Sequence, residues 1–426
     1  MRILMLSQFY PPIIGGIEQH VRNLSAELVT RGHEVAVATL WQEGLPEFEN
    51  DRGVRVYRIR GTLQRAAWLF SEKQRRHAPP FPDPELVAGL RSVIARERPD
   101  VVHAHNWLVH SFLPLKVWSG ARLVLTLHDY SLVCAKHRFV YHDSVCDGPG
   151  FKCFGCATAH YGLPRGVPTV LANWTMGLVE RAAVDMFLPV SQAVADGNDL
   201  VNNRLRFQVI PNFIPDDVAA TASRDRSYDA QLPAEDYLLF VGDITPDKGV
   251  LVLLKAHAEL PSPMPLVLIG RRDAAIPANP GKNVIILENL PHDAVMRAWS
   301  KSSMGCAPSI MPDPCPTVVM EAMATGCPVV GSRIGGIQDQ IVDGETGLLV
   351  PPGDADALRQ AVMRLLGDPA LRARMGEAAK RKAVEFQASV VVERIEQSYR
   401  ALLEDDNRAR KHMSSTTDQV ANDRAT

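Results

Sequence analysis

The chain has 426 residues, of which 46% are hydrophobic and 22% charged, the proportions of a globular protein with two or three domains. Its 46 Lys and Arg residues against 48 Asp and Glu residues leave a net charge of −2, which argues against nucleic-acid binding. No apolar run approaches the roughly 18 residues of a membrane span. The start, Met1 to Ser7, does not resemble a signal peptide. We therefore expect a cytoplasmic protein, with seven cysteines too few and too uneven for a disulfide scaffold.

The first half of the chain alternates buried apolar runs with helical spacing. Ile17, Val21, Leu24 and Leu28 repeat at intervals of four, three and four, as one face of a helix does. Such alternation predicts parallel βαβ units. Strands are expected at residues 2–6, 35–40, 53–59, 101–103, 123–127, 187–190 and 207–210.

The same pattern restarts near residue 237 and predicts a second α/β domain. Its strands are expected at residues 237–241, 266–269, 284–287, 304–307, 327–330 and 348–350, with helices near 250–260, 292–302, 317–325 and 354–366. Ligand sites of two such sheets lie at the carboxyl ends of their strands.

These patterns suggest five segments. Residues 1–215 form the first domain, 216–235 a linker without periodicity, and 236–385 the second domain. Residues 386–404 are helical, and 405–426 lack apolar spacing and are expected to be disordered.

The loop after the first strand carries Gly15-Gly16 and opens a helix. Two glycines let the backbone approach a ligand, and a helix N-terminus attracts phosphate or sugar oxygens. A tight turn alone is the alternative. The nicotinamide fingerprint Gly-x-Gly-x-x-Gly is absent, which weakens a dehydrogenase interpretation.

The segment from Pro312 to Met323 is the strongest motif. Asp313 lies in a loop, and Thr317 opens a helix whose free N–H groups at Thr317, Val318 and Val319 are expected to face the cleft. Glu321 lies one turn further on the same face. The free N–H groups can bind an anion, and the two carboxylates beside them can accept hydrogen bonds from hydroxyls. This combination suits a diphosphate joined to hydroxyl-rich sugars.

With these motifs the chain resembles the retaining nucleotide-sugar glycosyltransferases of family four, which have the GT-B fold of two Rossmann-like domains facing each other across a cleft. The resemblance covers about residues 1–400. The matching pieces are Gly15-Gly16-Ile17-Glu18, residues 100–105, Thr126-Leu127-His128-Asp129, Val190-Ser191, Ile210-Pro211-Asn212, residues 240–242 and 246–249, 313–321, Gly335-Gly336 and 343–347.

The resemblance implies a role for each matching residue. Glu321 would bind the ribose hydroxyls, and Asp313 would contact the donor sugar. Lys248 would pair with the diphosphate beside the amides of residues 317–319. His128 would lie beside the reacting sugar. Gly16, with Gly15 before it, would approach the phosphate or the acceptor, and the helix near 386–404 would cross back to the first domain.

Three positions depart from the family pattern. Asp313 stands where Glu is usual, and Pro316-Thr317 where a glycine is usual. Asp243 replaces an arginine expected near the diphosphate, a role that Arg271 or Arg272 would then take over.

Histidines and a basic segment give weaker signals. We expect His103 and His105 to point to opposite faces of their strand, with His105 toward the cleft. Residues 52–76 combine eight Lys and Arg residues with Trp68, Leu69 and Phe70. This segment is either a solvated basic loop or a membrane-surface patch for a lipid-linked acceptor.

Four cysteines, Cys134, Cys146, Cys153 and Cys156, fall within 23 residues. They suit a structural Zn²⁺ site, in which all four sulfurs must converge, or are unrelated thiols.

The sequence thus predicts a cytoplasmic retaining glycosyltransferase, possible at the membrane surface, that moves a sugar from a nucleoside-diphosphate sugar to an acceptor hydroxyl. Its acceptor would be a carbohydrate, a lipid-linked molecule or a small molecule, and no cofactor is expected for catalysis. The alternatives are a sugar-nucleotide epimerase and a non-catalytic donor-binding subunit of the same fold.

Overall fold

The computed structural model describes residues 1–423 except 14, 66–75, 143, 223–225 and 263, with side chains as far as Asp405. Its first unit is built on a seven-stranded sheet in the order β3-β4-β2-β1-β5-β6-β9. The sheet is parallel except for the antiparallel edge pair of β3 and β4. The strands span Arg2–Leu6 (β1), Glu34–Leu40 (β2), Phe48–Asp51 (β3), Val54–Ile59 (β4), Val101–Ala104 (β5), Arg122–Leu127 (β6) and Met186–Pro189 (β9).

Helices cover both faces of this sheet because successive side chains of a buried strand alternate between them. Ile3 and Met5 of β1 pack in the cluster formed with α1 (Gly16–Thr30) and α15 (Ala388–Asp423). Leu4 and Leu6 face the other way, toward α2 (Pro84–Glu97) and α3 (Leu108–Phe112). The near-continuous apolar runs of the sequence are therefore strands buried on both sides.

The second unit repeats the design with a six-stranded parallel sheet in the order β12-β11-β10-β13-β14-β15. Helices α9 and α13 cover one face, whereas α10 and α11 cover the other. The strands span Leu238–Val241 (β10), Leu266–Ile269 (β11), Val284–Leu287 (β12), Met304–Ala307 (β13), Val329–Ser332 (β14) and Gly347–Val350 (β15), and the helices Val250–Ala258 (α9), His292–Lys301 (α10), Thr317–Thr325 (α11) and Ala355–Gly367 (α13). The predicted elements of this half are confirmed.

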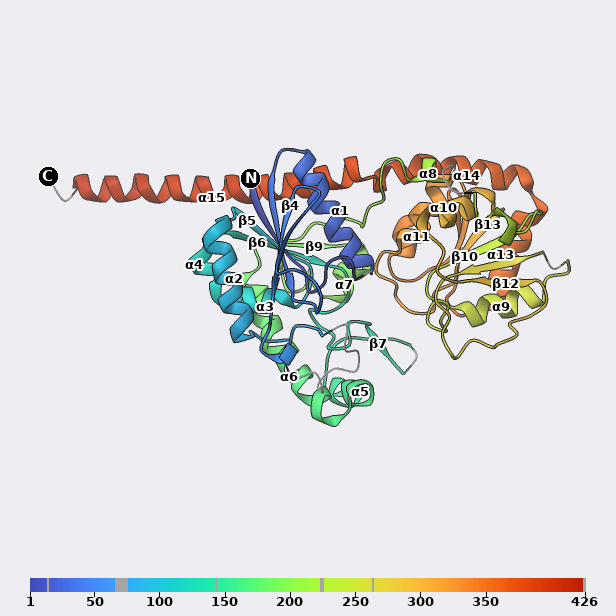
Figure 1. Cartoon of the computed structure of the whole chain (residues 1–426), viewed down its shortest axis with the longest axis horizontal. Helices are drawn as coiled ribbons and strands as arrows, with labels where there is room; N and C mark the ends of the chain where they lie inside the picture. Colours follow the sequence, from blue (N-terminus) through green and yellow to red (C-terminus); the bar gives the residue numbers. More distant parts are fainter. Residues whose placement is uncertain (14, 66–75, 143, 223–225, 263, 424–426) are drawn as a thin grey trace.

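The C-terminal helices tie the two units together. After α14 (Pro369–Ala383) on the second unit, α15 returns to the first and runs across it, as Figure 1 shows. Val391, Ile395 and Tyr399 of α15 pack against the first sheet. The Tyr399 hydroxyl lies 2.6 Å from His103 Nδ1.

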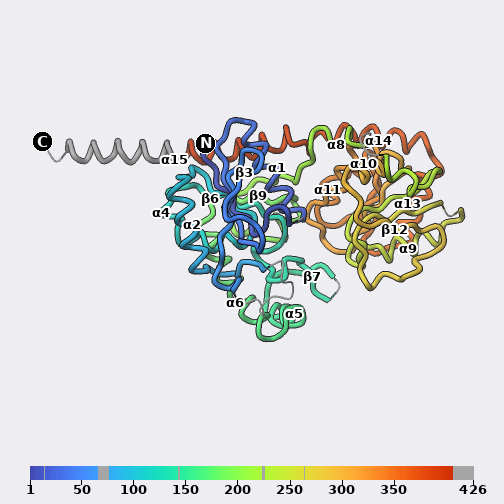
Figure 2. The backbone as a smooth tube through the Cα atoms, in the orientation of Figure 1, coloured from blue at the N-terminus to red at the C-terminus, as the bar shows by residue number. Residues whose placement is uncertain are grey.

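A lobe inserted after β6 projects beside the first sheet (Figure 2). It contains the hairpin of β7 (Val140–Tyr141) and β8 (Ser144–Val145), followed by α5 (Lys152–Tyr161) and α6 (Leu163–Ala183). Gly166 lets the two helices touch, since a Cβ there would lie 2.6 Å from the Thr158 backbone.

Three of the expected segments fold differently. The segment 207–210 forms an isolated bridge to Phe187 instead of a strand. Part of the expected linker folds as α8 (Val218–Thr221). The helix α15 continues to Asp423 through most of the segment expected to be disordered, because extending an anchored helix costs less than starting one. Arg206 pairs with Asp405 at 2.9 Å near the start of that extension.

Glycines permit close contacts between loops at the carboxyl edge of the second sheet. Gly249 has a φ of 73°, and a Cβ there would lie 1.8 Å from the carbonyl oxygen of Pro308. Gly335 has a φ of 56°, and its Cβ would lie 2.3 Å from the carbonyl oxygen of Asp313. These backbone contacts hold together the loops that follow β10, β13 and β14.

We predict that Gly249→Ala destabilises the second unit by more than about 1 kcal/mol, because both its backbone conformation and its neighbour exclude a side chain. Gly367→Ala is the matched control, since a Cβ at Gly367 meets nothing within 4 Å. Thermal unfolding should show a lower midpoint for the first variant only. Equal midpoints for both variants would contradict the role of the loop contact.

Candidate active site

A cavity of about 420 Å³ lies between the two units, at the carboxyl ends of their strands. The first unit supplies the segment after β6, and the second supplies the loops after β10 and β13. Its walls are Asp129, Tyr130, His137, Arg138, Asp243, Thr245, Asp247, Lys248, Ser309, Met311, Pro312, Asp313 and Pro314.

Each strong cation of the cavity wall is paired with a carboxylate. Lys248 Nζ contacts Asp313 Oδ2 within the second unit. Arg138 of the inserted lobe contacts Asp247 of the second unit, so this ion pair spans the cavity. The wall carries four carboxylates against these two cations, an excess of negative charge.

Asp243, the departure from the family pattern, faces the cavity and lies 3.4 Å from Arg271. The Arg271 side chain is 84% exposed and can reorient freely. Arg272 is held by a bond from its guanidinium to the carbonyl oxygen of Ile276 at 3.2 Å. Arg271 is therefore the more available of the two predicted cations.

The helix α11 begins at Thr317 with Pro316 at its N-cap, where no side chain caps the helix. The Val319 N–H donates to the carbonyl oxygen of Pro316 at 3.3 Å, a local turn bond. The Gln340 side chain donates to the same carbonyl at 3.1 Å and fixes this turn. The first amides of α11 thus follow directly on the loop that lines the cavity.

Glu321, on the second turn of α11, is buried and 3.1 Å from His292 Nε2. The hydrogen bond to Glu321 raises the pKa of His292 above its usual value, although partial burial opposes the shift. One carboxylate oxygen of Glu321 is therefore engaged by an imidazole at the start of α10.

Gly15 and Gly16 open α1 in an ordinary backbone conformation. Gly15 is extended, with φ at −172°, and a Cβ at Gly16 would meet nothing within 4 Å. The approach of a ligand to these glycines stays a prediction, for which Gly16 leaves open space.

The structure corrects the placement of two histidines. His103 and His105 were expected on opposite faces, but residues two apart in a strand share a face, and their ring centroids lie 4.2 Å apart. His103 is occupied by Tyr399 and by Thr126, whose hydroxyl lies 2.7 Å from His103 Nε2. His105 Nδ1 instead lies 3.0 Å from His128 Nε2.

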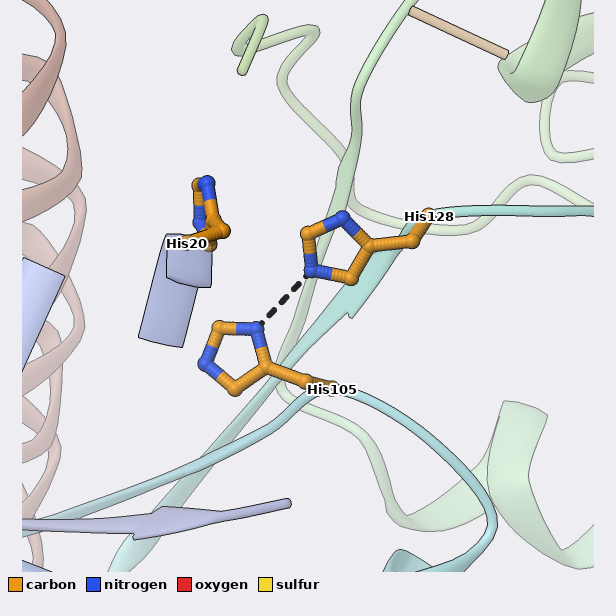
Figure 3. A group of neighbouring side chains, drawn as sticks. All are labelled: His20, His105 and His128. Atoms are coloured by element: carbon orange, nitrogen blue, oxygen red, sulfur yellow. Dashed lines mark hydrogen bonds between the residues drawn. The ribbon is translucent and has the colours of Figure 1, made fainter. Parts of the chain in front are cut away.

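His20 of α1 joins His105 and His128, so that three imidazoles from three elements converge (Figure 3). Their ligating nitrogens all lie within 4.8 Å of one another. Burial lowers the pKa of His128 to about 4, although the Asp129 charge opposes the shift, and lowers the pKa of His20 and of His105 well below the usual value. All three rings are therefore neutral at pH 7.

His128 itself does not line the cavity, whereas the adjacent Asp129 does. Burial alone would raise the pKa of Asp129, but the nearby His137 and Ser131 bring it below its usual value. Asp129 accepts from His137 Nδ1 at 3.0 Å. The charged carboxylate next to His128 in the chain is thus part of the cavity wall, whereas His128 is not.

The expected four-thiolate zinc site is not formed. Within the described ranges, only the three histidines bring three or more His, Cys, Asp or Glu ligand atoms within 4.8 Å of one another. Cys146 Sγ instead lies 3.4 Å from the carbonyl oxygen of Gly148, and Cys156 Sγ 3.7 Å from that of Val140. The cysteines sit on a loop, a hairpin end and one helix, and all four are free.

The centre of the basic segment, residues 66–75 with its aromatic cluster, lies outside the described residues. Several of its flanking arginines have partners: Arg55 pairs with Glu97 at 2.6 Å, Arg65 pairs with Glu85 at 3.1 Å, and the Arg60 guanidinium lies 3.8 Å from the Trp41 ring centroid. These residues contribute to the surface of the first unit.

Sequence reasoning missed Arg138 and His20 as site residues. Arg138 lies in the inserted lobe, where no periodicity predicts its direction. His20 lies on the second turn of α1 and could have been found, because the start of a helix after a glycine loop faces the carboxyl edge of the sheet.

Two family models match the chain: "Glycosyltransferase Family 4" over residues 14–218 and "Glycosyl transferases group 1" over residues 227–382. Glycogen synthase of Mycobacterium tuberculosis is 29% identical and covers 90% of each chain. Phosphatidyl-myo-inositol mannosyltransferase of Mycobacterium leprae is 28% identical over 94% of this chain and 96% of its own.

Solved structures share the whole architecture. Sucrose-phosphate synthase from Thermosynechococcus elongatus superposes with a TM-score of 0.71 at 22% identity, covering 95% of this chain and 99% of its own. Anabaena HepE in complex with UDP-glucose gives 0.65 at 16% identity, covering 94% and 99%. The fold is therefore GT-B. In the part of the chain described, no helix has the length and apolar character needed to cross a membrane.

The contact between His292 and Glu321 predicts a pH-dependent stability. Because the folded-state pKa of His292 is raised, its contribution is fully present below about pH 6.5, the unfolded pKa, and is lost as pH rises through the folded pKa. The stability difference between the native chain and His292→Asn should be larger at pH 6 than at pH 8.5. Chemical unfolding at both pH values measures it, and a pH-independent difference would contradict the ion pair.

Proposed function

Because the chain belongs to family 4 of the glycosyltransferases and transfers a sugar from a nucleotide sugar, we propose that the cavity between its units is the donor site. In this proposal the diphosphate lies against Lys248, Arg271 and the amides of Thr317 and Val318. The Val319 amide, also expected to be free, instead donates to the carbonyl oxygen of Pro316. The contact between Lys248 and Asp313 on the cavity wall carries the proposal, since it joins a cation for phosphate to a carboxylate for sugar hydroxyls.

Asp313 and Glu321 then bind different parts of the donor. Asp313 accepts hydrogen bonds from hydroxyls of the transferred sugar, and Glu321 uses the oxygen that His292 leaves free to accept from the ribose. Four carboxylates on the cavity wall suit a hydroxyl-rich ligand. Because the wall carries few cations, each cation that faces the phosphates should contribute strongly to donor binding.

The reaction exchanges one glycosidic bond for another. The bond from the anomeric carbon to the diphosphate oxygen breaks, and the acceptor oxygen bonds to the same carbon with retention of configuration. The acceptor proton passes to the departing phosphate. The protein's part is to orient the reactants and to stabilise the negative charge that develops on the diphosphate.

The acceptor is placed in the first unit, near Gly15 and Gly16 and the inserted lobe. The open space beside Gly16 supports this placement. A lipid-linked acceptor would bring the enzyme to the cytoplasmic membrane surface, and the name of the Mycobacterium leprae relative makes a lipid acceptor worth testing beside carbohydrates and small molecules. Catalysis in this proposal uses no cofactor.

The test is a thermal-shift screen of nucleotide sugars, because a ligand that binds only the folded state raises its melting temperature. UDP-glucose is the first donor to test, given the HepE complex. A donor that stabilises the chain is then incubated with acceptors, and the product's anomeric configuration is read by NMR. A stabilising donor that yields no transfer or hydrolysis would overturn the catalytic assignment.

Lys248→Ala should weaken donor binding by about 10–100-fold, the effect of losing a charge-assisted hydrogen bond worth about 1.5–3 kcal/mol. Calorimetric titration with the donor measures it. Lys255→Ala, an exposed lysine on α9, is the matched control and should bind as the native chain does. Unchanged affinity in Lys248→Ala would remove Lys248 from the site.

Glu321→Ala should abolish transfer while the fold survives, because the change costs the fold a side-chain contact with His292 but removes the carboxylate proposed to hold the ribose. Turnover with the identified donor is compared with that of Glu345→Ala, an exposed acid in the second unit. Circular dichroism verifies folding. Native turnover in the Glu321 variant would refute its role.

A further inference from the structure

The histidine cluster contains two buried ring nitrogens without a hydrogen-bond partner among the described residues, His20 Nε2 and His105 Nε2. His105 is 2% exposed and His128 is 9% exposed. The bond between His105 Nδ1 and His128 Nε2 uses one proton, whichever ring carries it. His20 Nε2 lies in the same cluster and has no hydrogen-bond partner among the described residues, so the protein atoms described do not complete this cluster.

The cluster has the ligand type and spacing of a metal site. Three imidazoles come from α1, the end of β5 and the end of β6, and one nitrogen from each lies within 4.8 Å of the other two. Two nitrogens bound to one tetrahedral Zn²⁺ at about 2.0–2.1 Å lie about 3.3 Å apart. The 3.0 Å between His105 Nδ1 and His128 Nε2 is close to that spacing.

We propose that His20, His105 and His128 bind one divalent transition-metal ion of the Zn²⁺ class. Each imidazole supplies one nitrogen, and the ion replaces the proton shared between His105 and His128. Imidazole is a ligand that suits zinc, copper, iron and nickel. With three protein ligands, the ion keeps a fourth position for water or another exchangeable ligand.

The surroundings favour these three rings over their neighbour. His103 is adjacent, but Tyr399 and Thr126 occupy both of its nitrogens. Phe213 packs against His20 with ring centroids 5.0 Å apart and holds that ring in place. The three ligands are thus oriented by packing before an ion arrives.

The experiment uses the full chain, freed of metal with a chelator and titrated with Co²⁺ and Zn²⁺. One equivalent of Co²⁺ should bind with the visible absorption of a four- or five-coordinate nitrogen site, without the intense sulfur-to-metal band of thiolate ligands. Zn²⁺ should displace it. This readout needs no donor, so it stands whether or not the proposed donor site is correct.

His20→Gln and His105→Gln should each lower the affinity by at least about tenfold, since even losing a partner of a ligand costs about 10–100-fold. His20→Gln removes a nitrogen that makes no hydrogen bond and should fold normally. His160→Gln, an exposed histidine on α5, and Cys156→Ser are controls and should keep native affinity. No Co²⁺ absorption in the native chain, a thiolate band, or loss of binding only in Cys156→Ser would overturn the proposal.

Discussion

The cavity depends on close backbone contacts between the loops at the carboxyl edge of the second sheet. The loop of Gly335 lies on the backbone of Asp313, and Gly249 lies on Pro308. No side chain fits between these loops, so they form one layer. That layer presents Lys248 and Asp313 to the cavity as a contacting pair. Gly249 and Gly335 thus shape the cavity wall through the backbone that they contact.

The two units meet through polar contacts beside this layer. Asn212 donates to the carbonyl oxygen of Cys315 at 3.0 Å, and the Gln192 N–H donates to Asp339 at 2.6 Å. Arg138 reaches Asp247 across the cavity from the inserted lobe. Polar contacts of this kind exchange with water at low cost, whereas α15, which follows α14 of the second unit, packs apolar side chains on the first sheet. The connection between the units thus combines a helix anchored on the first sheet with polar contacts beside the cavity.

Most strands and helices could be predicted from the sequence because their apolar residues recur with a strong period. The bounds of α11, Thr317 to Thr325, were predicted in this way. The antiparallel edge strand β3 was missed, because its half-exposed sequence lacks an apolar run. The cysteines of the inserted lobe were overinterpreted, since spacing along a chain does not show convergence in space. The contact of His20 with His128 joins residues 108 positions apart and depends on the sheet order, which no local pattern reveals.

The neutral state of His128 limits what the site can do with charge. With a pKa of about 4, its ring carries no positive charge at pH 7 and cannot stabilise a departing diphosphate as a cation. In the proposed donor site, that task would fall to Lys248, Arg138 and the dipole of α11, with Arg271 near the edge. Asp129, Asp243 and Asp247 would oppose a diphosphate, so Lys248 would have to leave Asp313 or share it with the donor. The proposal therefore couples donor binding to a rearrangement of the ion pair between Lys248 and Asp313.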